Sequence, residues 1–298
     1  MDVVEERADV PVRDASCSLR LLVPEPLDRP GPAVVLAPGF GGTADRLVEI
    51  ARGFARAGIV AAALDYRGFG GSGGTPRQVV DVAAEQEDLR AALEHVRARD
   101  DVDGRRVSLW GVSLGGALAI SVAAADGAVE RVVAEVPFNG FPRRVAGRSR
   151  ADTARLVLAI ADDVVRGLLG ARPRTIPLIG RPGRAAVVAT PEAQRHHRRV
   201  AATSPAWTNQ VAARGLFSMM RYRPADDAAR LGAPLLVCVA ERDTETPPEA
   251  ARELARRAVR GRSRSYPNSH FDFYGDPVLR DRLLADEVAF LREGHDDP

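Results

Sequence analysis

The sequence predicts an α/β protein, built on a mostly parallel central sheet of about eight strands with helices on both faces. Short, continuous apolar runs recur along the chain and alternate with segments of helical periodicity, which is typical of strands buried on both faces. Several of these runs end in glycine-rich turns, where a strand of a parallel sheet passes into a helix. A chain of 298 residues is long enough to bury the core of such a fold.

Each expected element follows from a local pattern. Strands are expected where a run is apolar or rich in β-branched residues and is bounded by a turn. The expected strands are 3–10, 16–23, 33–36, 59–64, 106–110, 129–136, 235–240 and 263–266. The expected helices are 47–55, 79–97, 114–125, 151–169, 248–258 and 278–291.

The alternation of strand and helix is interrupted once, between the sixth and the seventh expected strand. This interval holds one clear helix, at 151–169, and lies between two strands of one sheet, which indicates an insertion. We therefore expect an α/β core formed by residues 1–139 and 226–298, and a mainly helical, arginine-rich cap at 140–225.

Charge is distributed unevenly along the chain. All 42 basic residues are arginine, which excludes any mechanism that needs a lysine nucleophile or Schiff base. Segment 141–223 carries 16 arginines against four acidic residues, a net charge of +12. The rest, with 26 arginines and 36 acidic residues, has a net charge of −10. The basic segment indicates either a substrate that is anionic or linked to an acidic carrier, or a solvated surface that balances the acidic core. Nucleic-acid binding is not expected, because few aromatic residues accompany the arginines.

The expected setting of the protein is the cytoplasm. The chain opens with Asp2, Glu5 and Glu6 rather than with a basic, then apolar, signal segment. No apolar run approaches the ~18 residues that a membrane span requires. With only Cys17 and Cys238, a disulfide framework or a zinc site is not expected either. No cofactor, metal ion or membrane contact is therefore predicted, while both a monomer and a homodimer remain open.

One motif carries the chemistry of the expected core. Residues 111–115 match the pattern G-x-S-x-G, with Ser113 at its centre, between an apolar strand and a helix. A strand-to-helix turn this sharp strains the central serine and requires small neighbours, which Gly111, Gly115 and Gly116 provide. We expect Ser113 to be a nucleophile; the alternative is a serine in an ordinary turn.

A serine hydroxyl needs a base that removes its proton. Among the five histidines, His270 directly follows the last expected strand, and a loop at the carboxyl edge of the sheet is where such a base must lie. The other four lie in a helix, in the cap or in the polar C-terminal tail: His95, His196, His197 and His295. We expect His270 to be the base; the alternative is a structural loop histidine.

The imidazole in turn needs a carboxylate that orients it. Asp243 lies three residues past the strand at 235–240, and serine, aspartate and histidine then follow in the order typical of this arrangement. Glu241 leaves the strand earlier, and Asp272 is too close to the histidine in sequence. Glu135, near the end of the strand that follows the nucleophile helix, is a less suitable substitute.

Two backbone amides are expected to stabilise the oxyanion. One is the N–H of Leu114, directly after the nucleophile at the helix N-terminus. The other is the N–H of Phe40 in the glycine-rich loop after the strand at 33–36, where Gly39 and Gly41 let the amide turn inward.

These segments together resemble the α/β-hydrolase superfamily over essentially the whole chain apart from the cap. Besides 111–115, residues 36–42 are similar to its oxyanion loop, 65–73 to the loop after the following strand, and 241–247 to its acid loop. Pro38 departs from the pattern, since many members have histidine there. Among the subgroups, the chain most resembles the dienelactone-hydrolase-like and the small esterase or acyl-peptidase-like members. The resemblance implies the α/β-hydrolase fold and a serine hydrolase.

The predicted activity is hydrolysis of a carboxylic ester, thioester or related acyl bond of a small molecule. Ser113 attacks, His270 moves the proton, and Asp243 holds His270. The same residues also suit acyl transfer, cyclisation or C–C bond cleavage, because the outcome depends on which nucleophile reaches the acyl-enzyme. A catalytically silent binding protein is a further alternative, although such proteins usually lack one of these three residues.

Apolar cap residues could line an acyl pocket, and Trp207, Phe217 and Met220 are the candidates. Packing of the cap on the core is the other explanation for these side chains.

Overall fold

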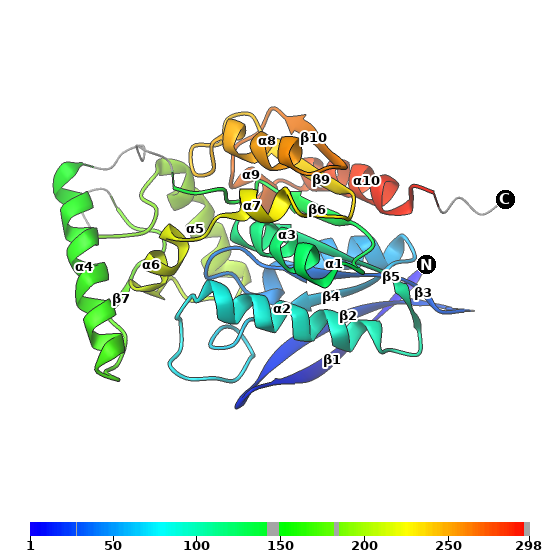
Figure 1. Ribbon diagram of the computed structural model, residues 1–298, viewed down its shortest axis with the longest axis horizontal. Coiled ribbons are helices and arrows are strands. Elements are labelled where there is room, and N and C mark those ends of the chain that lie inside the picture. Colours follow the sequence, from blue (N-terminus) through cyan, green and yellow to red (C-terminus); the bar gives the residue numbers. More distant parts are fainter. Residues whose placement is uncertain (28, 142–148, 182–184, 295–298) are drawn as a thin grey trace.

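The computed structural model describes residues 1–27, 29–141, 149–181 and 185–294 (Figure 1). Eight strands form the central sheet: β1 (Asp2–Val12), β2 (Ala15–Glu25), β3 (Gly31–Ala37), β4 (Val60–Leu64), β5 (Val102–Val112), β6 (Val132–Glu135), β9 (Leu235–Ala240) and β10 (Gly261–Tyr266). Their order is β1-β2-β4-β3-β5-β6-β9-β10. Strands β1, β2 and β4 pair antiparallel, and the pairs from β4 to β10 are parallel. The predicted mostly parallel sheet of eight strands is confirmed.

Helices cover both faces of this sheet (Figure 1). They are α1 (Val48–Arg56), α2 (Val82–Arg97), α3 (Leu114–Asp126), α8 (Pro248–Arg257) and α10 (Pro277–Arg292). Successive side chains of a strand point to opposite faces, so Val35 joins a core with α2, α3 and α8, while Val34 joins a second core with α1 and α10. Because both faces are buried, the strands read as continuous apolar runs.

The segment between β6 and β9 adds further elements: α4 (Arg150–Leu168), β7 (Thr175–Ile176), α5 (Pro191–Thr203), β8 (Val211–Ala212), α6 (Gly215–Met220) and α7 (Pro224–Ala228). Helix α4 is the one expected here, whereas α5 and the antiparallel pair of β7 and β8 are not predicted by the sequence. Figure 1 shows α4 at the edge of the molecule, beside β7 and α6.

A buried acid ties α4 to its neighbours. The carboxylate of Asp163 has no exposed surface, and it accepts hydrogen bonds from the backbone amides of Arg174 (2.6 Å) and Arg214 (2.8 Å). Four arginines of the basic segment lie outside the described residues: Arg143, Arg144, Arg148 and Arg184. Among the helices that are described, none has the length and apolar character needed to cross a membrane.

Candidate active site

Ser113 lies on a sharp turn between β5 and α3. Its backbone dihedral angles are φ 55° and ψ −118°, outside the regions that side-chain-bearing residues favour. Surrounding hydrogen bonds hold this strained conformation. The Ser113 amide donates to the carbonyl of Glu135 (2.8 Å), and the Ser113 carbonyl accepts from the amide of Phe138 (2.9 Å). The half-buried serine side chain is thus presented at the carboxyl edge of the sheet.

Close backbone packing explains the glycines around this turn. A Cβ atom on Gly111 would lie 2.3 Å from the carbonyl oxygen of Gly115, and one on Gly115 would lie 2.2 Å from the carbonyl oxygen of Ala37. Neither position can hold a larger residue unless the backbone moves. The small neighbours predicted from the motif are therefore required by contacts between β5, α3 and the loop after β3.

His270 and Asp243 form a buried pair in the loops after β10 and β9. His270 Nδ1 lies 2.8 Å from Asp243 Oδ2, which leaves Nε2 as the ring nitrogen that can accept a proton. The other oxygen of Asp243 accepts from the backbone amides of Glu245 and Thr246, both at 2.8 Å. Thr246 Oγ1 also donates to Asp243 Oδ2 at 2.7 Å.

The electrostatics of this pair favour charge on both partners. Burial opposes ionisation of Asp243, but the charge of His270 and hydrogen bonds from His270 and Thr246 outweigh it, so the pKa of Asp243 is lowered. Burial also opposes protonation of His270. The charge and hydrogen bond of Asp243, followed by the charges of Glu245 and Glu192, outweigh that effect and raise the pKa of His270.

Thr246 joins this pair to the turn after β6, and Tyr274 lies beside His270. Thr246 Oγ1 lies 3.2 Å from His270 Nδ1 and 3.1 Å from the carbonyl oxygen of Val136, in the turn that follows β6. The Tyr274 ring lies 5.9 Å from the His270 ring, centroid to centroid, and the Tyr274 hydroxyl and Ser113 Cβ both border Gly39. The structure therefore brings Ser113, His270 and Asp243 to one edge of the sheet.

The two expected oxyanion donors lie on either side of this edge. Leu114 is the first residue of α3, and Phe40 lies in the loop after β3. Among the described residues, neither backbone amide has a protein acceptor. The buried carboxylate of Asp65, in the loop after β4, accepts from the amide of Ala44, just after the oxyanion loop, at 2.6 Å and from that of Gly71 in its own loop at 2.9 Å.

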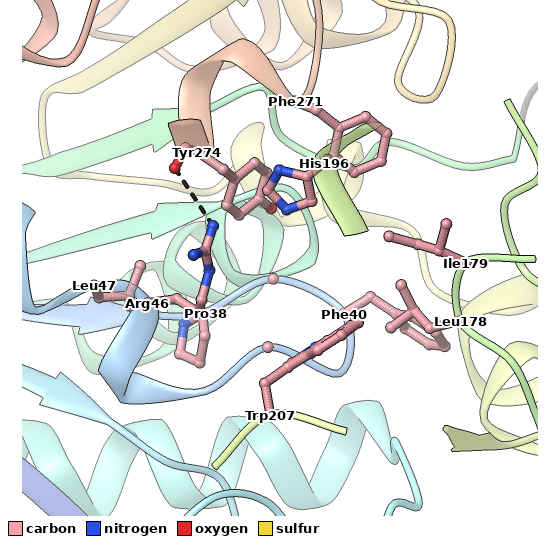
Figure 2. Close-up of a pocket in the computed structure, with 12 residues that line it drawn as sticks. Pro38, Phe40, Arg46, Leu47, Leu178, Ile179, His196, Trp207, Phe271 and Tyr274 are labelled. Carbon is pink, nitrogen blue, oxygen red and sulfur yellow. Dashed lines mark hydrogen bonds between the residues drawn. The ribbon is translucent and has the colours of Figure 1, made fainter. Parts of the chain in front are cut away.

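A small cavity of about 70 Å³ opens beside the oxyanion loop (Figure 2). It is lined by Pro38, Gly39, Phe40, Gly42, Arg46, Leu47, Leu178, Ile179, His196, Trp207, Phe271 and Tyr274. Of the three cap candidates, Trp207 lies in this wall. The structure does not bring Phe217 and Met220 to it, because both lie on α6, where their exposed fractions are 45% and 54%.

Helix α5 closes one side of the cavity. Glu192 Oε1 accepts from the backbone amide of Phe271 (2.9 Å), and Thr190, just before α5, donates through Oγ1 to Glu245 Oε1 (3.0 Å). The ring of His196 lies against Phe271, with centroids 4.9 Å apart. The segment between β6 and β9 thus contacts the His270 loop directly.

The remaining histidines stand apart from the acid–base pair. His95 lies on α2, the ring of His197 packs on Trp207, and His295 lies outside the described residues. Within the described part of the chain, no group of three or more His, Cys, Asp or Glu side chains is placed to hold a metal ion.

Glu135 pairs with another carboxyl group, that of Glu287 on α10, and not with His270. Both side chains are buried, and Trp110 Nε1 donates to Glu287 Oε2 at 3.2 Å. Burial is the main cause that raises the pKa of both acids, to about 7 for Glu287. The pair therefore retains a proton that free glutamates would release.

Removing one of these acids is expected to reduce the loss of stability that occurs as pH rises from 5 to 8. Between the ordinary pKa of glutamate and the raised values, the folded state binds more protons than the unfolded state, so the free energy of unfolding falls as pH rises. In Glu135→Gln, this fall between pH 5 and pH 8, measured by urea unfolding, should be smaller than in the wild type. An equal fall in both proteins would contradict the raised pKa of this buried pair. The control is Glu249→Gln on the exposed face of α8, which should show the same fall as the wild type.

Comparisons with known proteins agree with this architecture. In the solved structure of the α/β hydrolase GrgF from Penicillium sp. sh18, the similarity covers 97% of this chain and 98% of that one, with a TM-score of 0.80 and 20% identity. The quorum-quenching protein AidA of Acinetobacter baumannii (strain MDR-ZJ06) is 32% identical over 94% of this chain and 91% of its own length. The α/β-hydrolase fold that the motifs predict is thereby confirmed.

Two fungal relatives carry names that describe reactions. A thiohydrolase of Eupenicillium brefeldianum is 27% identical over 77% of this chain and 75% of its own. The polyketide transferase ATR5 of Stachybotrys chlorohalonatus (strain IBT 40285) is 28% identical over 75% of each chain. Residues 28–276 match the family described as serine aminopeptidase, S33. The chain therefore belongs to this family of α/β hydrolases.

Proposed function

We propose that the protein is a serine hydrolase that cleaves an ester, thioester or related acyl bond through an acyl-enzyme on Ser113. The observation that carries this proposal is the strained turn that presents Ser113 at the same edge as the buried pair of His270 and Asp243. A serine with only a structural role would not need a strained φ of 55°. A histidine with only a structural role would not need a buried carboxylate bonded to its Nδ1.

The proposed reaction follows from this geometry. Ser113 Oγ bonds to the acyl carbon as its proton passes to His270 Nε2, and the amides of Phe40 and Leu114 stabilise the oxyanion. The imidazolium then protonates the leaving group, and water repeats these steps on the acyl-enzyme. Asp243, whose pKa is lowered, stays ionised and stabilises the positive charge on the ring.

Labelling with a fluorophosphonate tests the nucleophile, because such probes phosphonylate an activated serine. We expect one adduct per chain, located by peptide mass spectrometry on Ser113. An adduct on another residue, or no adduct in a protein that hydrolyses p-nitrophenyl esters, would exclude this assignment.

The same acyl-enzyme could pass its acyl group to an acceptor other than water. The relative named as a polyketide transferase favours this second candidate function. The ratio of alcoholysis to hydrolysis, measured with an ester and increasing methanol or propanol, distinguishes the two. Transfer that saturates with the alcohol indicates an acceptor site, whereas a linear increase indicates a hydrolase.

The cavity is expected to favour short acyl chains. Its volume of about 70 Å³ is less than half of the ~150 Å³ that hold a benzene molecule. Leu178 forms part of its wall beside Phe40 (Figure 2). In Leu178→Ala, preference should move toward longer chains, by about fourfold in kcat/KM for each methylene newly accommodated. Leu216→Ala, a buried leucine of α6 away from the lining, should leave the chain-length profile of p-nitrophenyl esters unchanged. An unchanged profile in Leu178→Ala as well would place the acyl site elsewhere.

The pH dependence is expected to report the carboxylates around His270. Catalysis needs the neutral imidazole, so activity falls as pH drops through the pKa of His270. Because the charge of Glu245 raises that pKa, Glu245→Gln should move the acid limb of kcat/KM to lower pH. Glu249→Gln, on the exposed face of α8, should not move it. A shift of the limb to higher pH would contradict the proposed role of this charge.

A further inference from the structure

Tyr274 lies closer to the proposed nucleophile than its place in the sequence suggests. It belongs to a one-turn helix, α9 (Asp272–Gly275), four residues after His270. Its ring faces the rings of both His270 and His196, with centroids 5.9 and 5.4 Å away. Arg46 Nη2 approaches its carbonyl oxygen at 3.5 Å, as Figure 2 shows. The side chain is therefore held from several sides.

The hydroxyl of Tyr274 points to the junction of the nucleophile and the oxyanion loop. A Cβ atom on Gly39 would lie 2.6 Å from the Tyr274 hydroxyl oxygen and 3.3 Å from Ser113 Cβ. Gly39 immediately precedes Phe40, whose amide is one proposed oxyanion donor. The phenol oxygen, the nucleophile and the oxyanion loop therefore meet around one glycine, which has no side chain to separate them.

The phenol hydroxyl is also suited to donate a hydrogen bond. Burial above all, and the charge of Glu135, raise the pKa of Tyr274, although Arg46 and the hydrogen bond with Ser113 oppose this. The hydroxyl thus keeps its proton wherever His270 is neutral.

We propose that Tyr274 is a further catalytic residue, whose hydroxyl donates a hydrogen bond to the oxyanion formed by attack of Ser113. This inference rests on the proposed function. As the bond between Ser113 Oγ and the acyl carbon forms, the serine proton passes to His270, and the carbonyl π pair moves onto the oxygen. The phenol hydroxyl then donates to that oxygen as a third donor beside the amides of Phe40 and Leu114. When the carbonyl re-forms and the leaving group departs with the proton from His270, the hydroxyl returns to its resting position.

The variant Tyr274→Phe removes this donor and keeps the ring that packs on His270 and His196. We expect kcat for p-nitrophenyl acetate to fall about 10- to 100-fold, with KM changed less than about twofold, because the bond is made in the transition state. The Ki of a trifluoromethyl ketone, which forms a tetrahedral oxyanion on the serine, should rise by a similar factor. Tyr222→Phe is the matched control, since it removes another buried tyrosine hydroxyl, which is bonded to Ser121 at 2.6 Å; its kcat should stay within about twofold of the wild type.

Three results would overturn the proposal: an unchanged kcat in Tyr274→Phe, an increase in KM alone, or a lower kcat with unchanged affinity for the trifluoromethyl ketone. The last would make Tyr274 a residue that only positions Ser113 or His270. Each of these leaves Ser113 as the nucleophile. Failure of the proposed function has a different signature, because hydrolysis would then survive in Ser113→Ala.

Discussion

Replacing Ser113 with alanine is expected to lower kcat/KM for an activated ester by about 10⁵- to 10⁶-fold. The loss is this large because the nucleophile, its base and the orienting acid act as a unit, and without Oγ no acyl-enzyme can form. The oxyanion donors and the cavity remain, so slow turnover above the solvent rate should persist. The remaining kcat/KM of Ser113→Ala is measured with p-nitrophenyl acetate, at enzyme concentrations high enough to detect this slow turnover.

The control for this substitution is Ser121→Ala on the same helix. Ser121 is buried and hydrogen-bonded to Tyr222 and Asp227, but it faces away from the cavity lining. We expect activity within about threefold of the wild type and a loss of about 1 kcal/mol in the free energy of unfolding. A Ser113→Ala enzyme that keeps a tenth or more of wild-type activity would remove Ser113 from the mechanism.

The second large effect is expected at Asp243. Asp243→Asn should lower kcat about 10⁴-fold, because an amide can donate to Nδ1 and so leave the wrong ring nitrogen protonated. Two amides and a threonine hydroxyl already bond to the Asp243 carboxylate, so the asparagine also faces donors that it cannot fully accept. The loss should therefore appear in kcat more than in KM, in assays of ester hydrolysis.

Glu241→Gln is the matched control for Asp243. Glu241 begins the same loop, but its side chain is 40% exposed and pairs with Arg252. Its removal should change kcat less than about threefold. If Glu241→Gln or Glu135→Gln abolished activity while Asp243→Asn did not, the orienting acid would have to be reassigned.

The sequence allowed the sheet and the residues at its edge to be predicted because both are encoded locally. Strands buried on two faces need continuous apolar runs, and the turn at Ser113 needs glycines wherever backbones meet. The order of Ser113, Asp243 and His270 then places each residue after a different parallel strand, so their side chains lie at one edge. In the structure these residues do lie at one edge, with His270 bonded to Asp243.

The segment between β6 and β9 could not be predicted in the same way. Helix α5 begins Pro-Glu-Ala-Gln-Arg-His-His and has little apolar periodicity, and its place depends on tertiary bonds such as that from Phe271 to Glu192. Strands β7 and β8 have two residues each, too few for a pattern. Hydrophobicity alone makes Phe217 and Met220 candidates for the cavity wall, and it does not indicate which face of a short helix meets the cavity.

Two residues of the site were missed at the sequence level, although each had a signal. Thr246 lies three residues after Asp243, a spacing at which a side chain and an amide commonly bond back to an aspartate. Tyr274 lies four residues after His270, about one helical turn away, but only the fold shows that its hydroxyl lies beside Gly39, as Ser113 does.

Trapping the acyl-enzyme tests most directly whether Ser113 is the nucleophile. A p-nitrophenyl dialkylcarbamate carbamoylates the serine of such a hydrolase quickly. The carbamoyl group is hydrolysed slowly, so the covalent intermediate accumulates. We expect one equivalent of p-nitrophenol per chain and one carbamoyl group that peptide mass spectrometry locates on Ser113, with neither in Ser113→Ala. Inhibition of ester hydrolysis without a covalent adduct, or with the carbamoyl group on another residue, would contradict it.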